Sequence, residues 1–315
     1  MPNWILLSKT EIEELLQEYN LGKHLSHKHI DYALDNTVYI VRTSRGKFVL
    51  KLYNSADVKF INYQLRLNEY LRKKGVPVAK VLPTKDNKMI YTYKGKNLII
   101  QRFVEGHYFI RANSALVIDF AENVTKLHKA LVKLNIRGGD RWERAHQFDK
   151  DPEFCETARG FELSKAYKQY SQEVKVIDKH SLTRSIIHGD LTHDNIIVKC
   201  NKIAAFIDFD DAHRDYLVYE IAIALAKFVR KTKVNKDYIK LFMAHYRSPV
   251  PLDLNSKKAI YYFIKHRFLV AINWAENHRQ KDKRIHEGVG RWVEETIGQY
   301  KSISKIPVNE FVKLL

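Results

Sequence analysis

The sequence predicts an α+β protein of two lobes, a β-rich N-terminal lobe followed by a mostly helical C-terminal lobe. Short apolar runs separated by turns fill the first hundred residues, and this pattern is typical of strands and hairpins. Long segments with helical spacing of apolar residues dominate after Gly106. We place the N-terminal lobe at residues 1–100, the connecting segment at 101–106 and the C-terminal lobe at 107–315. Clefts between two such lobes are favoured ligand sites.

The predicted elements of the N-terminal lobe follow from local signals. A helix is expected near residues 9–19, opened by a capping serine or threonine and followed by glutamates. Two apolar-rich runs, 30–42 and 47–53, flank a turn that contains Gly46, and they predict a β-hairpin. Residues 60–74 have helical spacing and stop at Gly75 and Pro77. Two short strands are expected near 89–93 and 98–104.

The C-terminal lobe is predicted to be helical with one interruption. A long helix is expected over residues 114–134, and the 141–178 region and everything from Tyr216 onward have helical character. A β-hairpin within 185–208 interrupts these helices. Its two strands, 196–198 and 203–207, flank a polar turn.

Bulk composition excludes several classes of protein. Apolar residues make up 45% of the chain, enough for a sizeable core, and the two cysteines, Cys155 and Cys200, are too few for a disulfide framework. The apolar run at residues 4–7 lacks the basic segment of a signal peptide, and no stretch reaches the length of a membrane span. We therefore expect a cytoplasmic protein with no membrane association.

The formal net charge of +18 would suit an anionic partner. The basic residues are spread along the chain, however, with no basic tail and no aromatic-interleaved RNA-binding motif. A lysine-rich composition explains the charge more simply, so no nucleic-acid partner is expected. The oligomeric state cannot be predicted from these residues.

The polar residues around the predicted hairpin indicate a metal site. In an antiparallel hairpin, the residue that enters the first strand lies beside the one that leaves the second, so Asn195 and Asp208 are expected to be neighbours. One carboxylate and one amide oxygen suit Mg²⁺, which takes few protein ligands and completes its octahedron with water and phosphate oxygens. Asp190 lies on the loop before this hairpin, where it could accept a proton from an attacking hydroxyl.

Residues 188–195 read H-G-D-L-T-H-D-N and residues 207–209 read I-D-F. Here the sequence resembles the aminoglycoside phosphotransferase and homoserine kinase-like (choline kinase-like) superfamily, which has the protein-kinase-like fold. The resemblance covers nearly the whole chain and is strongest over 186–222. It implies that Asp190 is the catalytic base, that Asn195 and Asp208 bind Mg²⁺, and that ATP or GTP is the phosphate donor.

The resemblance also assigns nucleotide-binding residues in the N-terminal lobe. Lys51 stands alone among apolar residues of a predicted strand, where a lysine must reach the rim or meet an anion. The family pattern places Lys51 on the α- and β-phosphates. Its acidic partner would be Glu69, the only acid between Asp57 and Asp86, although the family's glutamate often lies a turn earlier, where this chain has Gln64 or Leu65.

Four further residues complete the predicted nucleotide site. Asn36 occupies the phosphate-covering turn, which here lacks glycine and so departs from the usual pattern. Gln101, Phe103 and Val104 would form the hinge that reads the nucleobase, although an ordinary buried strand explains them about as well.

The expected function is that of a Mg²⁺-dependent small-molecule kinase acting on a hydroxyl. Residues 251–315 carry twelve Lys and Arg against seven Asp and Glu. This balance argues against a polycationic aminoglycoside and favours an amino-acid alcohol such as homoserine. An aminoglycoside kinase, a protein-serine kinase and a nucleotide-binding pseudokinase remain alternatives.

Overall fold

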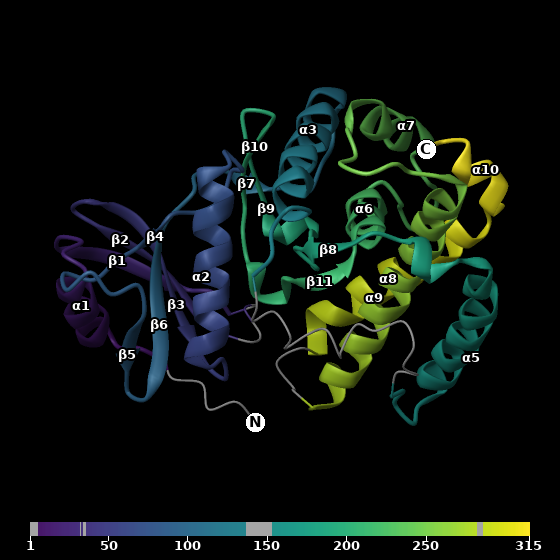
Figure 1. Cartoon of the computed structure of the whole chain (residues 1–315). Helices are drawn as coiled ribbons and strands as arrows, with labels where there is room; N and C mark the ends of the chain where they lie inside the picture. Colours follow the sequence, from purple (N-terminus) through teal and green to yellow (C-terminus); the bar gives the residue numbers. More distant parts are fainter. Residues whose placement is uncertain (1–5, 32, 34–35, 137–152, 282–285) are drawn as a thin grey trace.

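The computed structural model describes residues 6–31, 33, 36–136, 153–281 and 286–315, and it has the two lobes expected from the sequence (Figure 1). The N-terminal lobe is an antiparallel sheet with strand order β1-β2-β3-β6-β4, in which β5 also pairs with β6. Its strands are β1 (His24–His29), β2 (Asn36–Thr43), β3 (Gly46–Tyr53), β4 (Val81–Leu82), β5 (Tyr91–Tyr93) and β6 (Lys96–Arg102).

Two helices cover the two faces of this sheet. Helix α1 (Lys9–Glu18) begins at a capping box in which Ser8 and Glu11 satisfy each other's backbone N–H groups. It buries Ile12, Leu15 and Leu16 against the sheet. Helix α2 (Val58–Lys73) begins at Asp57 and lies between the sheet and the C-terminal lobe (Figure 1).

The pleat of β3 determines where Lys51 points. Phe48, Leu50 and Leu52 face the α1 side and belong to its core cluster. Because side chains alternate along a strand, Lys51 must face the opposite side, toward α2 and the other lobe. The hairpin predicted at this position is confirmed, with β2 and β3 paired from Asn36–Tyr53 to Thr43–Gly46.

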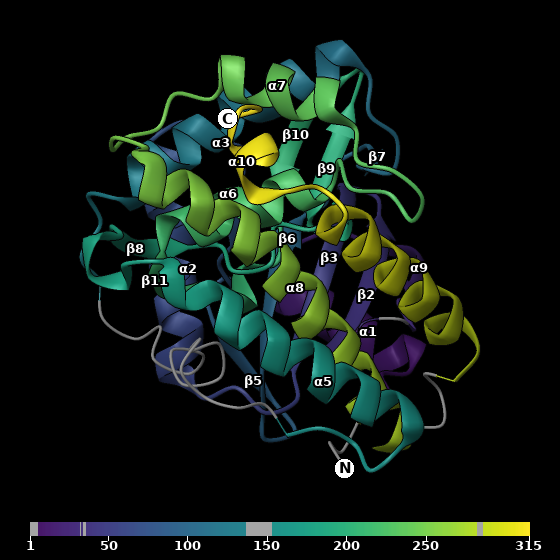
Figure 2. The ribbon, with the colours of Figure 1, turned by 90° about the vertical axis from the view of Figure 1, so that its right-hand side faces the viewer.

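The C-terminal lobe packs helices around one large apolar core. Its helices are α3 (Ser114–Leu131), α5 (Ala158–Glu173), α6 (Leu217–Ala226), α7 (Lys236–His245), α8 (Leu254–Lys281), α9 (His286–Ser304) and α10 (Val308–Val312). Helix α6 is buried along its whole length. Helix α8 contacts α5, α6, α9 and α10, and Figure 2 shows it running through the middle of this lobe.

Short strands carry the polar segments toward the cleft. The predicted hairpin is confirmed as β9 (Ile196–Lys199) and β10 (Lys202–Phe206), and β7 (His107–Tyr108) pairs with β9. Strands β8 (Arg184–Ile187) and β11 (His213–Tyr216) form a separate pair. Residues 141–152 of the predicted 141–178 helical region lie outside the described residues; the described part forms α5 and one short 3₁₀ turn, Val174–Val176.

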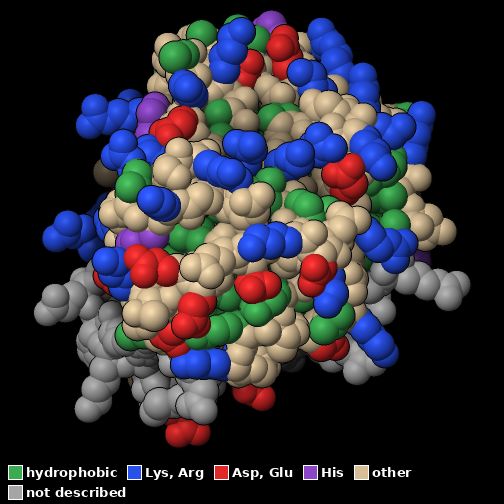
Figure 3. Space-filling model, turned by 90° about the vertical axis from the view of Figure 1, so that its left-hand side faces the viewer, with side chains coloured by type: hydrophobic (Ala, Val, Ile, Leu, Met, Phe, Trp, Pro, Cys, Tyr) green, Lys and Arg blue, Asp and Glu red, His purple; other side chains and the backbone are tan. Residues whose placement is uncertain are grey.

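The high positive charge is dispersed on the face of the N-terminal lobe. Figure 3 shows Lys and Arg side chains over this face, with Asp, Glu and uncharged side chains among them. Within the part of the chain that is described, no helix combines the length and the apolarity that a bilayer crossing requires.

Candidate active site between the lobes

Lys51 forms an ion pair with two carboxylates of the opposite lobe. Its Nζ lies 2.8 Å from Asp208 Oδ1 and 2.6 Å from Asp210 Oδ1. Burial alone would lower the pKa of Lys51, but the two carboxylates outweigh it and raise that pKa well above its usual value. Burial and the neighbouring Asp208 raise the pKa of Asp210 to about 6. The predicted lysine therefore does meet an anion in the cleft.

Asp210 is also the point where other residues of the N-terminal lobe converge. Asn36 Nδ2 donates to Asp210 Oδ2 at 2.8 Å, and Gln64 Nε2 donates to Asp210 Oδ1 at 2.8 Å. The side-chain oxygen Oε1 of Gln64 in turn accepts a hydrogen bond from the Tyr53 hydroxyl at 2.9 Å. Strands β2 and β3 and helix α2 thus all reach one carboxylate of the C-terminal lobe.

Glu69 does not lie beside Lys51, and this part of the prediction needs correction. Its carboxylate pairs with Arg72 at 3.0 Å and with Lys73 at 3.7 Å on the exposed side of α2. Glu69 is five residues beyond the buried Gln64, a rotation of about 140° around the helix axis. It therefore faces solvent, and Gln64 occupies the inward position.

The loop before β9 brings Asp190 and Asn195 together. Asn195 Nδ2 donates to the Asp190 carbonyl and to Asp190 Oδ2, both at 2.8 Å. The backbone N–H of Ile207 donates to the Asn195 carbonyl at 3.0 Å, so the ladder of the hairpin extends to the residue before Asp208. Asp208 itself has φ 62° and ψ 71°, a left-handed conformation that is costly for a residue with a side chain. Such strain is commonly found at functional sites.

Gly189 permits the sharp turn that presents Asp190. Its φ is +81°, and an added Cβ would lie 2.3 Å from the carbonyl oxygen of Asp211. Only glycine combines this backbone conformation with so close an approach to another segment.

Glu220 and His188 stabilise this loop through buried contacts. The buried Glu220 carboxylate accepts hydrogen bonds from the backbone N–H groups of His188 and Gly189. Burial raises the pKa of Glu220 to about 7, against the effect of these two donors. The ring of His188 is buried, lies 3.0 Å from the Ile207 carbonyl through Nε2, and packs on Phe209. His188 therefore serves to stabilise the structure of this loop.

Arg267 is a residue of the site whose place the sequence did not indicate. It lies on α8 and donates through a guanidinium nitrogen to Asp190 Oδ1. The two side chains are 19% and 25% exposed, respectively, so the pair is mostly shielded from water yet open on one side. The contact joins positions 77 residues apart, and only the packing of α8 against the rest of the lobe could reveal it.

The predicted hinge residues lie at and just beyond the end of the interior strand β6. Gln101 lies in β6, opposite Val49 of β3. The N–H of Phe103 donates to the Lys47 carbonyl at 3.1 Å, and Lys47 Nζ lies 5.2 Å from the centre of the Phe103 ring. Val104 is half-buried. None of the three has a described contact with Lys51, Asp208 or Asp210.

The donor set at the cleft fits a hard divalent cation. Asp208 and the Asn195 amide could supply oxygen ligands from one end of the hairpin, with the Asp210 carboxylate close by, and the side chain of Asp208 is 48% exposed. The ammonium of Lys51 already bridges the two carboxylates, which shows that this position attracts positive charge.

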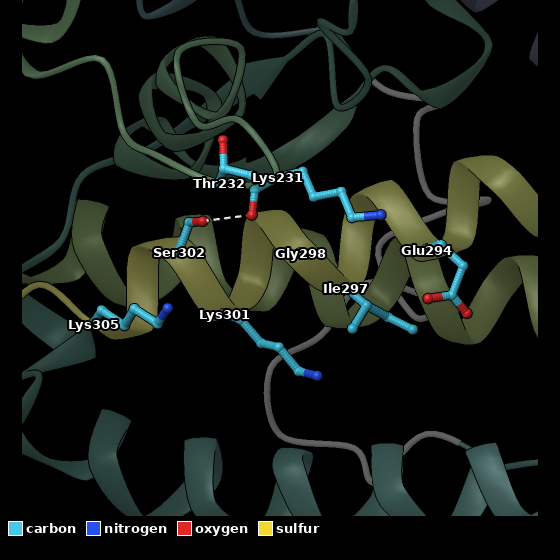
Figure 4. A pocket seen from close by; sticks show the side chains of 8 residues that line it. All are labelled: Lys231, Thr232, Glu294, Ile297, Gly298, Lys301, Ser302 and Lys305. Atoms are coloured by element: carbon cyan, nitrogen blue, oxygen red, sulfur yellow. Dashed lines mark hydrogen bonds between the residues drawn. The ribbon is translucent and has the colours of Figure 1, made fainter.

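A surface cavity of about 400 Å³ lies apart from these residues, beside α9. In Figure 4 the lysine side chains extend along its rim, and Ser302 bonds to the backbone carbonyl of Lys231. It is lined by Lys231, Thr232, Glu294, Ile297, Gly298, Lys301, Ser302 and Lys305. No residue of the candidate active site lines it.

The chain matches a family model described as the phosphotransferase enzyme family over residues 28–248. This match spans both lobes and includes Lys51, Asp190, Asn195 and Asp208. The chain belongs to the phosphotransferase enzyme family.

Similar proteins agree with this family assignment. The homoserine kinase of Rhodopseudomonas palustris (strain BisA53) is 27% identical over 258 residues, which cover 79% of this chain and 78% of that relative. The homoserine kinase of Pseudomonas aeruginosa (strain LESB58) is 26% identical over 237 residues and covers 73% of each chain.

A solved structure shows that the fold is that of known small-molecule kinases. Amicoumacin kinase hAmiN, in complex with AMP-PNP, Ca²⁺ and Ami, has a TM-score of 0.70 at 17% identity and covers 94% of both chains. The predicted kinase-like fold and the prediction of a phosphotransferase of the small-molecule kinase type are thus confirmed for this family member.

Proposed function

We propose that this phosphotransferase is a Mg²⁺-dependent kinase that transfers the γ-phosphate of ATP or GTP to the hydroxyl of a small amino-acid alcohol such as homoserine. The observation that carries the proposal is the position of Asp190. Asn195 orients its carboxylate, and the same short hairpin carries Asp208, which pairs with Lys51 across the cleft.

The reaction assigns each residue a task. The acceptor hydroxyl attacks the γ-phosphorus, the bond to the β,γ-bridging oxygen breaks, and the nucleoside diphosphate leaves. Asp190 orients the hydroxyl and takes its proton. Lys51 leaves its ion pair with Asp208 and Asp210 to bind the α- and β-phosphates. Asn195 and Asp208 would hold a Mg²⁺ ion, which would supply positive charge beside the phosphates.

The choice of acceptor rests on two features. Several relatives that match over about two thirds or more of their length are named homoserine kinases. The last 65 residues carry an excess of basic side chains, twelve against seven, which disfavours a polycationic acceptor. The nucleobase-reading role of Gln101, Phe103 and Val104 and the phosphate contact of Asn36 belong to the same proposal.

An ADP-release assay tests this function. The wild-type chain is incubated with ATP or GTP and Mg²⁺ against homoserine, choline, ethanolamine, methylthioribose, hydroxylysine and kanamycin. We expect turnover of homoserine that falls by roughly 10²–10⁴-fold in Asp190→Ala. Asp86→Ala, on the exposed surface of the N-terminal lobe, is the control and should behave as wild type.

Two outcomes would contradict the proposal. If Asp190→Ala turned over homoserine as fast as the wild-type chain, Asp190 would not be the catalytic base. If no acceptor of the panel were phosphorylated while Mg²⁺-dependent nucleotide binding remained visible by thermal shift, the assigned acceptor class would be excluded. A nucleotide-binding pseudokinase or a protein acceptor would then be favoured.

A further inference from the structure

Arg267 contacts the carboxylate that the proposed reaction needs as its base. Its hydrogen bond to Asp190 Oδ1 is the one that Arg267 makes among the described residues, although a guanidinium has five N–H donors. Four donors are therefore left for another partner. The side chain keeps 19% of its surface exposed, so the cleft can reach it.

The chemistry of phosphoryl transfer does not explain this arginine. Asn195 already orients Asp190 through Oδ2, so a second orienting group is redundant. An ion pair with the base also competes with the acceptor hydroxyl for the oxygens of Asp190. The pair with Asp190 compensates the charge of Arg267 but uses only one of its N–H groups, so the others need a further acceptor.

We propose that Arg267 binds the carboxylate of the acceptor, so that the site selects hydroxy acids over neutral and cationic alcohols. The inference rests on the proposed function and deepens it by naming the group that is recognised. Arginine presents parallel N–H groups that match a carboxylate in a bidentate geometry, which lysine cannot reproduce. The acceptor hydroxyl lies on Asp190, and its carboxylate takes the donors of Arg267 that face the cleft.

The direct contact of the pair limits how far apart the two functional groups of the acceptor can lie. Asp190 and Arg267 are in direct hydrogen-bond contact, so a hydroxyl on one and a carboxylate on the other are separated by three consecutive hydrogen bonds. A bent chain of three bonds of about 2.8 Å spans roughly 5 Å. A four-carbon hydroxy acid can adopt this separation in a partly bent conformation, whereas serine approaches it only when fully extended.

A set of matched acceptors tests how much the carboxylate of the acceptor contributes to turnover. L-homoserine is compared with its neutral carboxamide, with 4-hydroxybutanoate, which lacks only the amino group, and with 3-amino-1-propanol, which lacks only the carboxylate. L-serine tests the length. We expect the wild-type chain to prefer the two carboxylates over the amide and the amino alcohol by about 10²-fold or more in kcat/KM.

The variant Arg267→Gln should lower kcat/KM for homoserine by roughly 10²–10³-fold and remove the preference over the carboxamide. Arg267→Lys keeps the positive charge but lacks the parallel N–H groups of a guanidinium, and it should restore part of the preference. Lys258→Gln is the matched control. It removes a charge from the same helix nine residues earlier, which places it on the opposite side of α8.

The pattern of loss distinguishes recognition from positioning. If Arg267→Gln slowed homoserine and its carboxamide by equal factors, Arg267 would act only through Asp190, and the inference would be overturned. Thermal unfolding and Mg²⁺-dependent nucleotide binding verify that each variant folds. Should Arg267→Gln fail to fold, the Arg267→Lys comparison decides in the same way.

The inference can fail separately from the proposed function. If the wild-type chain phosphorylated no acceptor, the proposed function would fall, and binding by calorimetry would test Arg267 alone. In the presence of Mg²⁺ and a non-hydrolysable nucleotide, 4-hydroxybutanoate should bind at least tenfold more tightly than its amide, and Arg267→Gln should abolish the difference. Equal binding of acid and amide by the wild-type chain would overturn the inference.

Discussion

The side-chain amide of Gln64 donates a hydrogen bond to Asp210 across 2.8 Å, joining helix α2 of one lobe to the segment after β10 of the other. Lys51 and Asn36 reach the same carboxylate from neighbouring strands. Asp210 therefore links three elements of the N-terminal lobe to the loop that carries Asp208.

Replacing Gln64 should affect nucleotide use, whereas replacing Glu69 should not. Gln64→Ala removes a hydrogen bond to a charged group, and we expect the KM for the Mg²⁺-nucleotide to rise about tenfold or more. Glu69→Ala removes an exposed salt bridge on the same helix and should change the KM less than about twofold. Steady-state kinetics with varied nucleotide measures both. A larger effect of Glu69→Ala would restore Glu69 as the functional partner of Lys51.

Removing Asp208 should weaken nucleotide binding only when Mg²⁺ is present. In Asp208→Ala one of the two proposed metal ligands is lost, and the Mg²⁺-dependent affinity should fall roughly 10–100-fold. Affinity measured in EDTA should stay within a few-fold of the wild-type value. Calorimetric titration with and without Mg²⁺ gives both numbers, and an unchanged Mg²⁺-dependent affinity would remove Asp208 from the metal site.

Gly189→Ala should be more damaging than Gly95→Ala, although both glycines have positive φ. At Gly95 an added Cβ meets nothing within 4 Å, so only the left-handed conformation costs stability, about 1–2 kcal/mol. At Gly189 the Cβ also collides with the Asp211 carbonyl, and we expect about 3 kcal/mol or more together with a loss of turnover. Denaturant unfolding compares the two variants. Similar losses of stability in the two variants would mean that the segment around Asp211 moves away at little cost, which would contradict this prediction.

Lys227 should destabilise the wild-type chain at neutral and lower pH. Its Nζ is buried without a hydrogen-bond partner among the described residues and lies 5.2 Å from the centre of the Phe109 ring. Burial lowers the pKa of Lys227 to about 7. Between pH 7 and the ordinary lysine pKa the unfolded chain binds more protons than the folded chain, so this group makes stability rise with pH in that window.

The variant Lys227→Met removes this pH-dependent penalty. It should exceed the wild-type chain in stability by more at pH 6 than at pH 9, with a ceiling of about 1.4 kcal/mol for each unit by which the pKa is displaced. Thermal unfolding at the two pH values measures the difference. Lys126→Met, at an exposed position of α3, is the control. An equal gain at both pH values would contradict the assignment of a buried charge.

Local patterns were sufficient for most elements of this fold. The capping box of α1, the β2–β3 hairpin and the β9–β10 hairpin each depend on residues close in sequence. Strand β1 was not predicted, because His24–His29 has almost no apolar alternation and remains largely exposed. Its place depends on pairing with β2, which no local signal encodes.

Contacts between residues close in one loop were easier to predict than contacts that depend on how a helix is rotated or how helices pack. Asp190 and Asn195 lie five residues apart in one loop, and their contact follows from that loop. Helix periodicity, applied to the buried positions of α2, could have shown that Glu69 points away. Nothing local connects Arg267 to Asp190, since only the packing of α8 brings them together.

Asp190 and the arginine beside it both belong to the helical half of the chain, whereas Lys51, the proposed phosphate-binding residue, belongs to the other half. Opening and closing of the lobes would change the distance from Lys51 to Asp190 but leave the contact between Asp190 and Arg267 intact. With the roles proposed above, a change of acceptor would need substitutions in the helical half alone, and the half that carries Lys51 could stay unaltered.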